Sequence, residues 1–532
     1  MSRTGRDLIS LDAPHMSLKY LGDPKGPGSF FYVGGGNGEK LVSLYCMKRG
    51  WRRIQNSSRT DYKLKWCSIK QPANYDAFRE GKQLLYQIPN NRIFTTKIGL
   101  LNCLRGYEKY ESITGKLWNS RVLKMADFVP ETYRLDVPSE REQFFATYNA
   151  SETWICKPTG LNQGIGIFLL QNPRQVIDLR CKYEPPRDAD RISKGISDQA
   201  RIVQRYIPNP LLLGGRKFDV RAYMIIASTV PYIVFFRHGY VRLTCNKYDS
   251  KSTDLIGHLT NQYMQKKHPR YEELKEETIW SMERFNSYVN KVFASDKGLP
   301  KDWVLDVFTK KMQVIMTHCF KTFKSKLACR RGYFDLIGCD FLIDENFQVW
   351  LLEMNCNPSL DTSSEVQKEV IPEVVKDTLD LTIEIFKKSK GEPILPLKTQ
   401  TPCVLLYNGV LNEELVKFNW PRNSSSITVQ KEPVKNVVKL PPIGRASKSK
   451  CVSNRAIPGT SKTTRPTAAM TPVHTKKSKC VKLPPVAKPA PRSKTLAVLP
   501  GIGQVRNTSS RTAPPENPQA SRCKLPKISK KS

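Results

Sequence analysis

Three side chains with oxygen ligands stand near the ends of two neighbouring apolar segments. Glu353 and Asn355 alternate in VWLLEMNCNP (349–358), so a strand there points both toward the same face. Asp340 lies in the preceding apolar segment, and a hairpin turning at residues 344–346 brings it opposite Glu353. Such oxygens are the ligands that Mg²⁺ prefers. We therefore predict a magnesium site, although a single acidic residue more often lies at a solvated strand end.

A second charged set alternates along KFDVR (217–221). A strand here places Lys217, Asp219 and Arg221 on one face and apolar residues on the other. The charged face suits a polyanion, while the alternative is the solvated surface of an edge strand. The short apolar segment IVQRYI (202–207) ends before a proline, and such a segment makes a good hinge on which a nucleotide base can stack. Its presence favours the polyanion interpretation of KFDVR.

A lysine at the end of an apolar segment precedes a glycine-rich loop. Lys157 is followed by Gly160, Gly164 and Gly166. Glycines let backbone N–H groups approach phosphates, and the lysine supplies a charge. The loop is neither a Walker A sequence nor a dinucleotide fingerprint, so a plain hairpin loop is the competing interpretation.

These residues need strands to bring them together. The chain is longer than one core usually allows, so we expect a mixed α/β fold with two or three packed subdomains. A small α/β unit is expected at 26–86, an amphipathic segment at 97–110, and a largely helical region at 271–326 broken near Gly298. Strands are expected at 153–157, 202–207, 217–226, 232–236, 334–343 and 348–355.

The formal net charge of +38 indicates a polyanionic partner, either nucleic acid or an acidic protein. Residues 431–532 hold 23 Lys and Arg against two acids, 15 prolines and no aromatic residue, so we expect a disordered tail. Without aromatics for base stacking, nucleic acid is the weaker candidate. The Lys-Leu-Pro repeats at 439–441, 482–484 and 524–526 are docking motifs or a coincidence of composition.

Other classes of protein find little support. None of the 14 cysteines is spaced as in a zinc knuckle or redox pair, and no convincing Cys/His or Ser/His/Asp arrangement occurs in the expected strands. The first 14 residues lack an apolar signal core, and no apolar run reaches membrane-spanning length. We expect a cytosolic or cytoskeletal protein.

The order of lysine, glycine-rich flap, hinge strand, Lys-x-Asp-x-Arg and Asp…Glu-x-Asn resembles the ATP-grasp fold. The strings KFDVR (217–221), HLTN (258–261) and LEMNCNP (352–358) resemble the tubulin-tyrosine-ligase-like family over residues 26–390. In the flap, NQG (162–164) replaces the usual Ser-Arg-Gly and resembles the polyglycylase branch. The resemblance implies that this change removes an arginine contact to phosphate or acceptor.

The resemblance implies roles for individual residues. Lys97, Lys157 and Lys217 would contact ATP phosphates, Gln163 and Gly164 of the flap would bind the nucleotide, and Gln204, Arg205, Tyr206 and Ile207 would line the adenine site. Asp219 would be the ribose- or metal-side carboxylate, and Arg221 and Arg242 would grip the amino acid or acceptor carboxylate. Asn261 lies in the matching helix-start motif, and Asp340, Glu353 and Asn355 would hold Mg²⁺.

The implied activity is that of an ATP-dependent carboxylate–amine ligase acting through an acyl phosphate. It would elongate glycine chains on glutamate side chains of tubulin in microtubules, or of another acidic protein such as a histone chaperone of the nucleosome-assembly type. The alternatives are a polyglutamylase of the same fold and an inactive microtubule-binding member. We expect a monomer without a membrane partner in the cytoplasm and cytoskeleton, including the cilium or axoneme.

The same reasoning divides the chain into segments. They are a flexible N-terminus (1–25), an N-terminal α/β subdomain (26–94), a central ATP-grasp subdomain (95–209), a C-terminal catalytic ATP-grasp subdomain (210–390), a connector (391–430) and the basic tail (431–532).

Overall fold

The computed structural model describes residues 22–114, 123–183, 200–389, 391–411 and 413–414. These residues belong to one compact unit of the chain. The basic tail predicted at 431–532, its Lys-Leu-Pro repeats and most of the predicted N-terminal segment lie outside the described residues.

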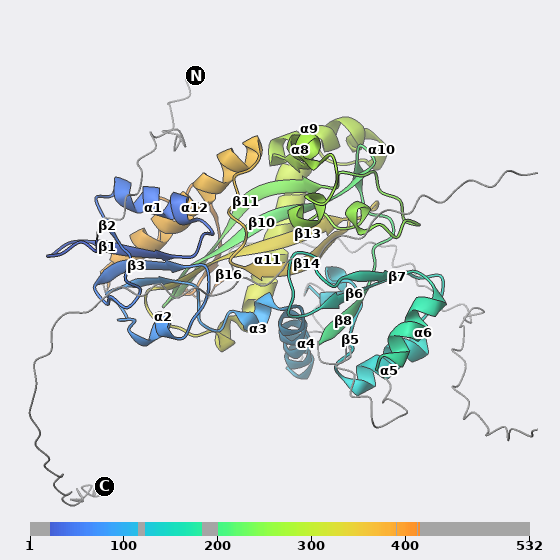
Figure 1. The fold of residues 1–532 in the computed structure, drawn as a ribbon, viewed down its shortest axis with the longest axis horizontal. Helices are drawn as coiled ribbons and strands as arrows, with labels where there is room; N and C mark the ends of the chain where they lie inside the picture. The colour runs from blue at the N-terminus through green and yellow to red at the C-terminus, as the bar shows by residue number, and fades with distance from the viewer. Residues whose placement is uncertain (1–21, 115–122, 184–199, 390, 412, 415–532) are drawn as a thin grey trace, which may run out of the picture. The chain divides into compact units, whose positions relative to one another are not determined.

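A large mixed sheet of 12 strands forms the centre of this unit (Figure 1). Nine strands follow the order β16-β15-β11-β10-β13-β4-β3-β1-β2, and three more pair at their sides. Their bounds are β1 Phe30–Gly34, β2 Arg52–Ile54, β3 Tyr62–Cys67, β4 Leu84–Tyr86, β9 Leu212–Leu213, β10 Arg216–Thr229, β11 Tyr232–Leu243, β12 Ile279–Trp280, β13 Tyr333–Ile343, β14 Val349–Cys356, β15 Val404–Asn408 and β16 Glu413–Glu414.

A second sheet of four strands has the order β5-β8-β6-β7. Its strands are β5 Thr132–Arg134, β6 Trp154–Pro158, β7 Phe168–Leu170 and β8 Arg201–Arg205. Helices α5 (Pro138–Thr147) and α6 (Pro173–Cys181) cover it, and their buried residues share a core with Trp154. The predicted strands at 153–157 and 202–207 are confirmed within one or two residues, and the α/β class is confirmed.

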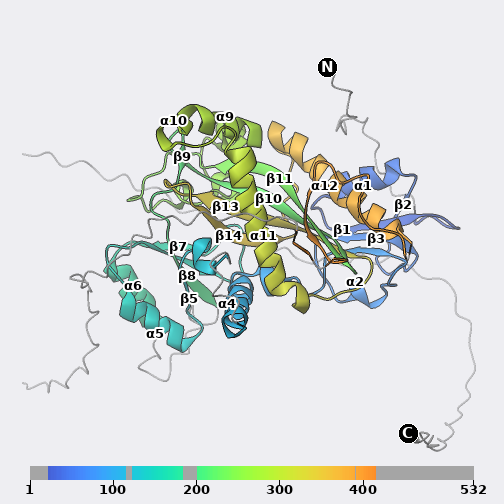
Figure 2. The ribbon, with the colours of Figure 1, turned by 180° about the vertical axis from the view of Figure 1, so that it is seen from behind.

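The central strand β10 explains how the large sheet carries both a core and a charged site. Phe218 and Met224, on one face, pack in the core that helix α11 (Thr309–Phe323) closes. The opposite face is charged in its first half and apolar from Tyr223 onward, where α12 (Glu365–Lys387) covers it. Figures 1 and 2 show α12 and α11 on opposite faces of the sheet.

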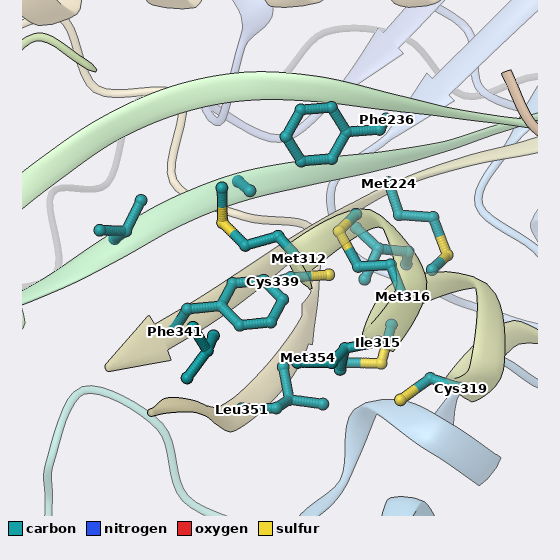
Figure 3. Packing of buried hydrophobic residues seen from close by; sticks show 14 of the residues in the cluster. Met224, Phe236, Met312, Ile315, Met316, Cys319, Cys339, Phe341, Leu351 and Met354 are labelled. Atoms are coloured by element: carbon teal, nitrogen blue, oxygen red, sulfur yellow. The ribbon is translucent and has the colours of Figure 1, made fainter. Parts of the chain in front are cut away.

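The core beneath α11 is rich in sulfur-containing side chains (Figure 3). Met312 and Met316 of α11 meet Met224 of β10, Phe236 of β11 and Met354 of β14. Methionine fills irregular gaps without strict shape requirements. The core therefore fixes β10, β13 and β14 side by side, and these three strands carry the charged residues of the site.

The remaining helices follow the predicted pattern. The predicted break in the region 271–326 is confirmed, because α10 ends at Gly298, whose φ of +59° is a left-handed C-terminal cap. Within the described part of the chain, no helix is long and apolar enough to cross a membrane. The other helices are α1 Glu39–Lys48, α2 Ala73–Asp76, α3 Arg92–Thr95, α4 Lys97–Ile113, α7 Gln262–Gln265, α8 Tyr271–Leu274, α9 Met282–Val292 and α10 Ala294–Lys297.

Candidate functional site

A cavity between the two sheets collects most of the predicted site residues. It holds about 910 Å³ of space when its open mouth is included. Arg221 and Asn355 do not line it. The predicted residues that do are Lys97, Lys157, Gln163, Gly164, Gln204, Arg205, Tyr206, Ile207, Lys217, Asp219, Arg242, Asn261, Asp340 and Glu353.

Three lysines reach the cavity from three different elements. Lys97 starts α4, where Thr96 caps the helix, and its Nζ lies 3.3 Å from Glu353 Oε2. Lys157 is the last residue but one of β6, and its Nζ donates to Gln204 Oε1 at 2.7 Å. Lys217 lies on β10 and donates to the Tyr206 hydroxyl at 2.8 Å. The cavity therefore concentrates positive charge in an enclosed place, which suits a polyphosphate.

The pKa values of two lysines reflect this crowding. Burial lowers the pKa of Lys157 to about 8, and repulsion from Lys97 adds to the shift. Burial lowers the pKa of Lys217 to about 7, where repulsion from Lys157 adds and attraction to Asp219 opposes. A polyanion in the cavity would supply the missing negative charge and restore the charged form of both.

The predicted magnesium ligands converge at the hairpin of β13 and β14. Asp340 and Glu353 face each other in the strand register, as predicted. The Asn355 amide lies 3.2 Å from Asp340 Oδ2 and 2.9 Å from Glu353 Oε1. Burial raises the pKa of Glu353, but the Lys97 ammonium and the Asn355 amide outweigh it and lower the pKa to about 2. Glu353 is thus ionised at neutral pH.

This donor set fits Mg²⁺. Two carboxylates supply oxygen ligands beside a cavity with room for phosphate oxygens, and Mg²⁺ takes few protein ligands, whereas the Asn355 amide donates its N–H groups to both carboxylates. Among the residues that the structure describes, no group of three or more His, Cys, Asp and Glu side chains is placed to hold a metal ion.

A buried network of ion pairs joins this hairpin to β10 and β11. Arg242 binds Asp219 through two contacts of 2.7 and 2.6 Å and reaches Asp340 at 2.9 Å. Arg221 binds Asp340 through contacts of 2.5 and 3.1 Å. All four side chains are buried, so the solvated-edge interpretation of KFDVR is wrong. Removing one member of such a pair costs about 3–5 kcal/mol, because the other charge is left buried and unpaired.

Arg221 and Asn355 act from behind the cavity wall. Arg221 orients Asp340, and Asn355 bridges the two carboxylates. The predicted role of Arg221 in gripping an amino acid stays a prediction, as does that of Arg242.

The glycine-rich loop that was predicted to be a flap lies between β6 and β7, and Gln163 and Gly164 of this loop line the cavity. Gln163, Gly164 and Gly166 have φ values of +62°, +76° and +71°. A Cβ on Gly164 would stand 3.0 Å from Asn261 Nδ2. Asn261 caps α7 by accepting from the Met264 N–H at 3.0 Å, which fixes its position beside the flap.

The hinge after β8 presents both polar and apolar groups. The Gln204 side chain is held between Lys157 and Thr132, whereas the Arg205 side chain is half exposed and pairs with Glu152. The backbone and Tyr206 therefore define this wall of the cavity more than the Arg205 guanidinium does.

Several lining residues were missed by sequence reasoning. Thr260 donates to Asp219 Oδ2 at 2.7 Å, and His258 contacts Tyr206. Both belong to HLTN (258–261), so the motif was a signal for them. The apolar part of the cavity wall was not predicted, because apolar side chains do not indicate a particular chemistry. Its residues are Ile155, Ile167, Leu259, Leu342 and Leu352.

Comparison with known proteins agrees with this geometry. Residues 77–391 match the model of the tubulin-tyrosine ligase family. The chain is 53% identical over 454 residues to a macaque (Macaca fascicularis) protein named protein polyglycylase TTLL10, covering 80% of this chain and 71% of that protein. It is 53% identical over 414 residues to the human protein named inactive polyglycylase TTLL10, covering 72% of this chain and 62% of the human protein.

A more distant relative widens the comparison. A Tetrahymena thermophila protein named probable alpha-tubulin polyglutamylase Ttll1 is 29% identical over 351 residues, which cover 63% of this chain and 81% of that protein. Together with the two sheets that enclose one cavity, the family match identifies the fold as ATP-grasp-like. The chain belongs to the tubulin-tyrosine ligase family.

Proposed function

We propose that this protein is an ATP- and Mg²⁺-dependent carboxylate–amine ligase that adds glycine to acidic protein side chains, extending glycine chains on tubulin. The observation that carries the proposal is the convergence of three lysines with Asp340 and Glu353 at one cavity, where Asn355 bridges the two carboxylates from behind the wall. An enclosed positive site beside an oxygen-only metal site is what phosphoryl transfer from ATP requires.

The residues support a two-step reaction. The lysines hold the phosphates of ATP while an acceptor carboxylate takes the γ-phosphoryl group, giving an acyl phosphate and ADP. The amine of glycine then attacks the acyl carbon and releases phosphate. Mg²⁺, held by Asp340, Glu353 and Asn355, would neutralise charge on the phosphates. The flap at 159–167 closes over the site and excludes water, which would hydrolyse the acyl phosphate.

Glycine as the added amino acid rests on the relatives. The chain is 53% identical to a protein named as a polyglycylase and 29% identical to one named as a probable polyglutamylase. The NQG sequence of the flap (162–164) supports the same choice. Tubulin as acceptor also rests on these names, and the positive charge of the chain favours an acidic acceptor in general.

An inactive protein that binds an acidic partner is the second candidate, because the human relative is named inactive. The carboxylates and the three lysines that line one cavity favour catalysis, since a protein that only binds an acidic partner needs no internal site for a polyphosphate and a metal ion. Cytoplasmic, cytoskeletal and ciliary locations, a monomeric state and a histone chaperone as acceptor belong to the same proposal.

The decisive test is a transfer assay. Purified protein is incubated with Mg²⁺-ATP, one amino acid at a time, and either tubulin or a glutamate-rich peptide that already carries a glycine branch. We expect mass increments of whole glycine residues on the pre-glycylated peptide and none with glutamate. Glutamate increments would assign the polyglutamylase alternative, and no increment with any amino acid would overturn the ligase proposal.

A further inference from the structure

Behind Lys217 runs a short series of buried hydrogen bonds that the reaction does not use directly. Lys217 Nζ donates to the Tyr206 hydroxyl at 2.8 Å. The same hydroxyl lies 2.7 Å from His258 Nδ1, and His258 Nε2 lies 2.8 Å from the Ser252 carbonyl oxygen. The series joins β10, the hinge after β8 and the HLTN segment.

The partners at the two ends fix the direction of every bond. The Ser252 carbonyl oxygen only accepts, so the proton of the His258 ring is on Nε2. Burial lowers the pKa of His258, which keeps the ring neutral and makes Nδ1 an acceptor. The Tyr206 hydroxyl then donates to Nδ1, and its oxygen lone pairs are left for the Lys217 ammonium.

Besides the Tyr206 hydroxyl, the Lys217 ammonium contacts mainly aromatic rings. Its Nζ also lies 4.3 Å from the centre of the Tyr206 ring and 5.7 Å from that of Tyr248. The charged groups that act on it are Lys157 on β6, which repels it, and Asp219 on β10, which attracts it. A lysine has a long flexible stem, so its charge needs fixed partners to be aimed.

We propose that Tyr206 and His258 are positioning residues that aim the Lys217 ammonium into the nucleotide cavity. The inference rests on the proposed function only in taking ATP as the ligand. Its core is that His258, as the neutral Nε2–H tautomer, orients the Tyr206 hydroxyl, and that this hydroxyl holds Lys217. Neither residue reacts with substrate.

The first test compares Tyr206→Phe with Tyr248→Phe. Both remove one hydroxyl from the same hydrophobic cluster. The Tyr248 hydroxyl donates to the Pro208 carbonyl and also interacts with the Tyr206 hydroxyl, but it is not the group that accepts from Lys217 or that contacts His258 Nδ1. The readout is the affinity for a non-hydrolysable ATP analogue, measured by calorimetry across pH. We expect Tyr206→Phe to bind about tenfold more weakly, as for loss of a hydrogen bond to a charged group.

The pH dependence separates positioning from general damage. Loss of the hydroxyl removes an acceptor that stabilises charged Lys217, so the alkaline decline in affinity should begin at lower pH in Tyr206→Phe and be unchanged in Tyr248→Phe. An unchanged affinity and pH profile in Tyr206→Phe, or equal shifts in both variants, would overturn the inference.

The second test concerns His258. His258→Asn keeps an amide near the Nδ1 position and should retain most of the affinity, whereas His258→Leu should match Tyr206→Phe. In the ligand-free protein, the ¹⁵N spectrum of labelled histidine should show a protonated Nε2 and an unprotonated Nδ1 for His258, assigned by loss of the signal in His258→Asn. The opposite tautomer of His258, or a charged His258 ring at neutral pH, would refute the proposed series of hydrogen bonds. This measurement uses the parent protein, so it remains valid if a variant fails to fold.

These readouts keep the two proposals apart. A parent protein that binds the ATP analogue but transfers no glycine refutes the proposed function and leaves this inference intact. A parent that transfers glycine while Tyr206→Phe binds normally refutes this inference alone.

Discussion

Lysines with lowered pKa values mark the cavity as a place that lacks a negative charge. Burial is the main cause of both pKa shifts, and repulsion of Lys157 by Lys97 and of Lys217 by Lys157 adds to it. Burial raises the pKa of Glu353, but Lys97, the Asn355 amide, Lys157 and Arg242 outweigh burial and lower this pKa to about 2. The site is therefore arranged for a ligand that carries several negative charges.

Proton uptake on ATP binding is the first prediction. The pKa of Lys217 is about 7 and that of Lys157 about 8, against an ordinary value of 10.5. At a pH above these pKa values, Lys217 and Lys157 of the free protein have mostly lost their positive charges. A bound polyphosphate raises both pKa values again. At pH 8, binding should draw protons from solution, and affinity should fall as pH rises further. Calorimetry in two buffers of different ionisation enthalpy measures this, and heats that are independent of the buffer would contradict it.

Glu353→Gln is the second prediction at this scale. The change keeps the shape of the side chain but removes the charge that Mg²⁺ and Lys97 face. Ligation should fall at least about a hundredfold, while the melting temperature stays near that of the parent. The control is Glu345→Gln at the exposed turn of the same hairpin, where the new amide can still accept from Asn209. Equal turnover in parent and Glu353→Gln would refute the metal assignment.

At the scale of elements, the flap between β6 and β7 offers a matched pair of glycines. Gly164 has a φ of +76° and packs against Asn261, whereas Gly160 has no atom within 4 Å of an added Cβ. Gly164→Ala should disfavour the closed flap by about 1–2 kcal/mol, which raises the KM for ATP about fivefold to thirtyfold. Gly160→Ala should behave as the parent. Steady-state kinetics check this, and equal KM values in both variants would show that the flap does not need this conformation.

Local patterns allowed much of the site to be predicted. Period-two alternation placed Lys217 and Asp219 on one face, and the hairpin placed Asp340 opposite Glu353. These relations depend on residues close in sequence. The register Asp219 with Arg242 depends on the β10–β11 pairing, which no local pattern specified.

Contacts between distant segments could not be predicted in this way. The Asn37 side chain donates to Asn357 Oδ1 at 2.8 Å and to the Pro358 carbonyl at 2.9 Å. These bonds tie the loop between β1 and α1 to the residues that follow β14. No spacing or periodicity relates residues 320 positions apart. The apolar wall residues Leu342 and Leu352 were missed for another reason, because their types also suit any buried strand.

At the scale of the whole molecule, the charge of the chain is the main feature beyond the site. Residues 431–532 carry 23 Lys and Arg against two acids. Removing them should weaken binding to microtubules, because fewer cations face an acidic surface, and should leave ligation on a free peptide nearly unchanged. Cosedimentation and the peptide assay measure the two effects, and an equal loss of both would show that this segment completes the fold.

The central claim is that Lys157, Lys217, Asp340 and Glu353, with Asn355 behind the two carboxylates, surround a single nucleotide with its magnesium ion. The most direct measurement is the affinity for a non-hydrolysable ATP analogue with and without Mg²⁺, in the parent and in Glu353→Gln. We predict a single nucleotide per chain, tighter binding with Mg²⁺ in the parent, and little effect of Mg²⁺ in the variant. Absence of binding, or the same Mg²⁺ dependence in both proteins, would contradict the account.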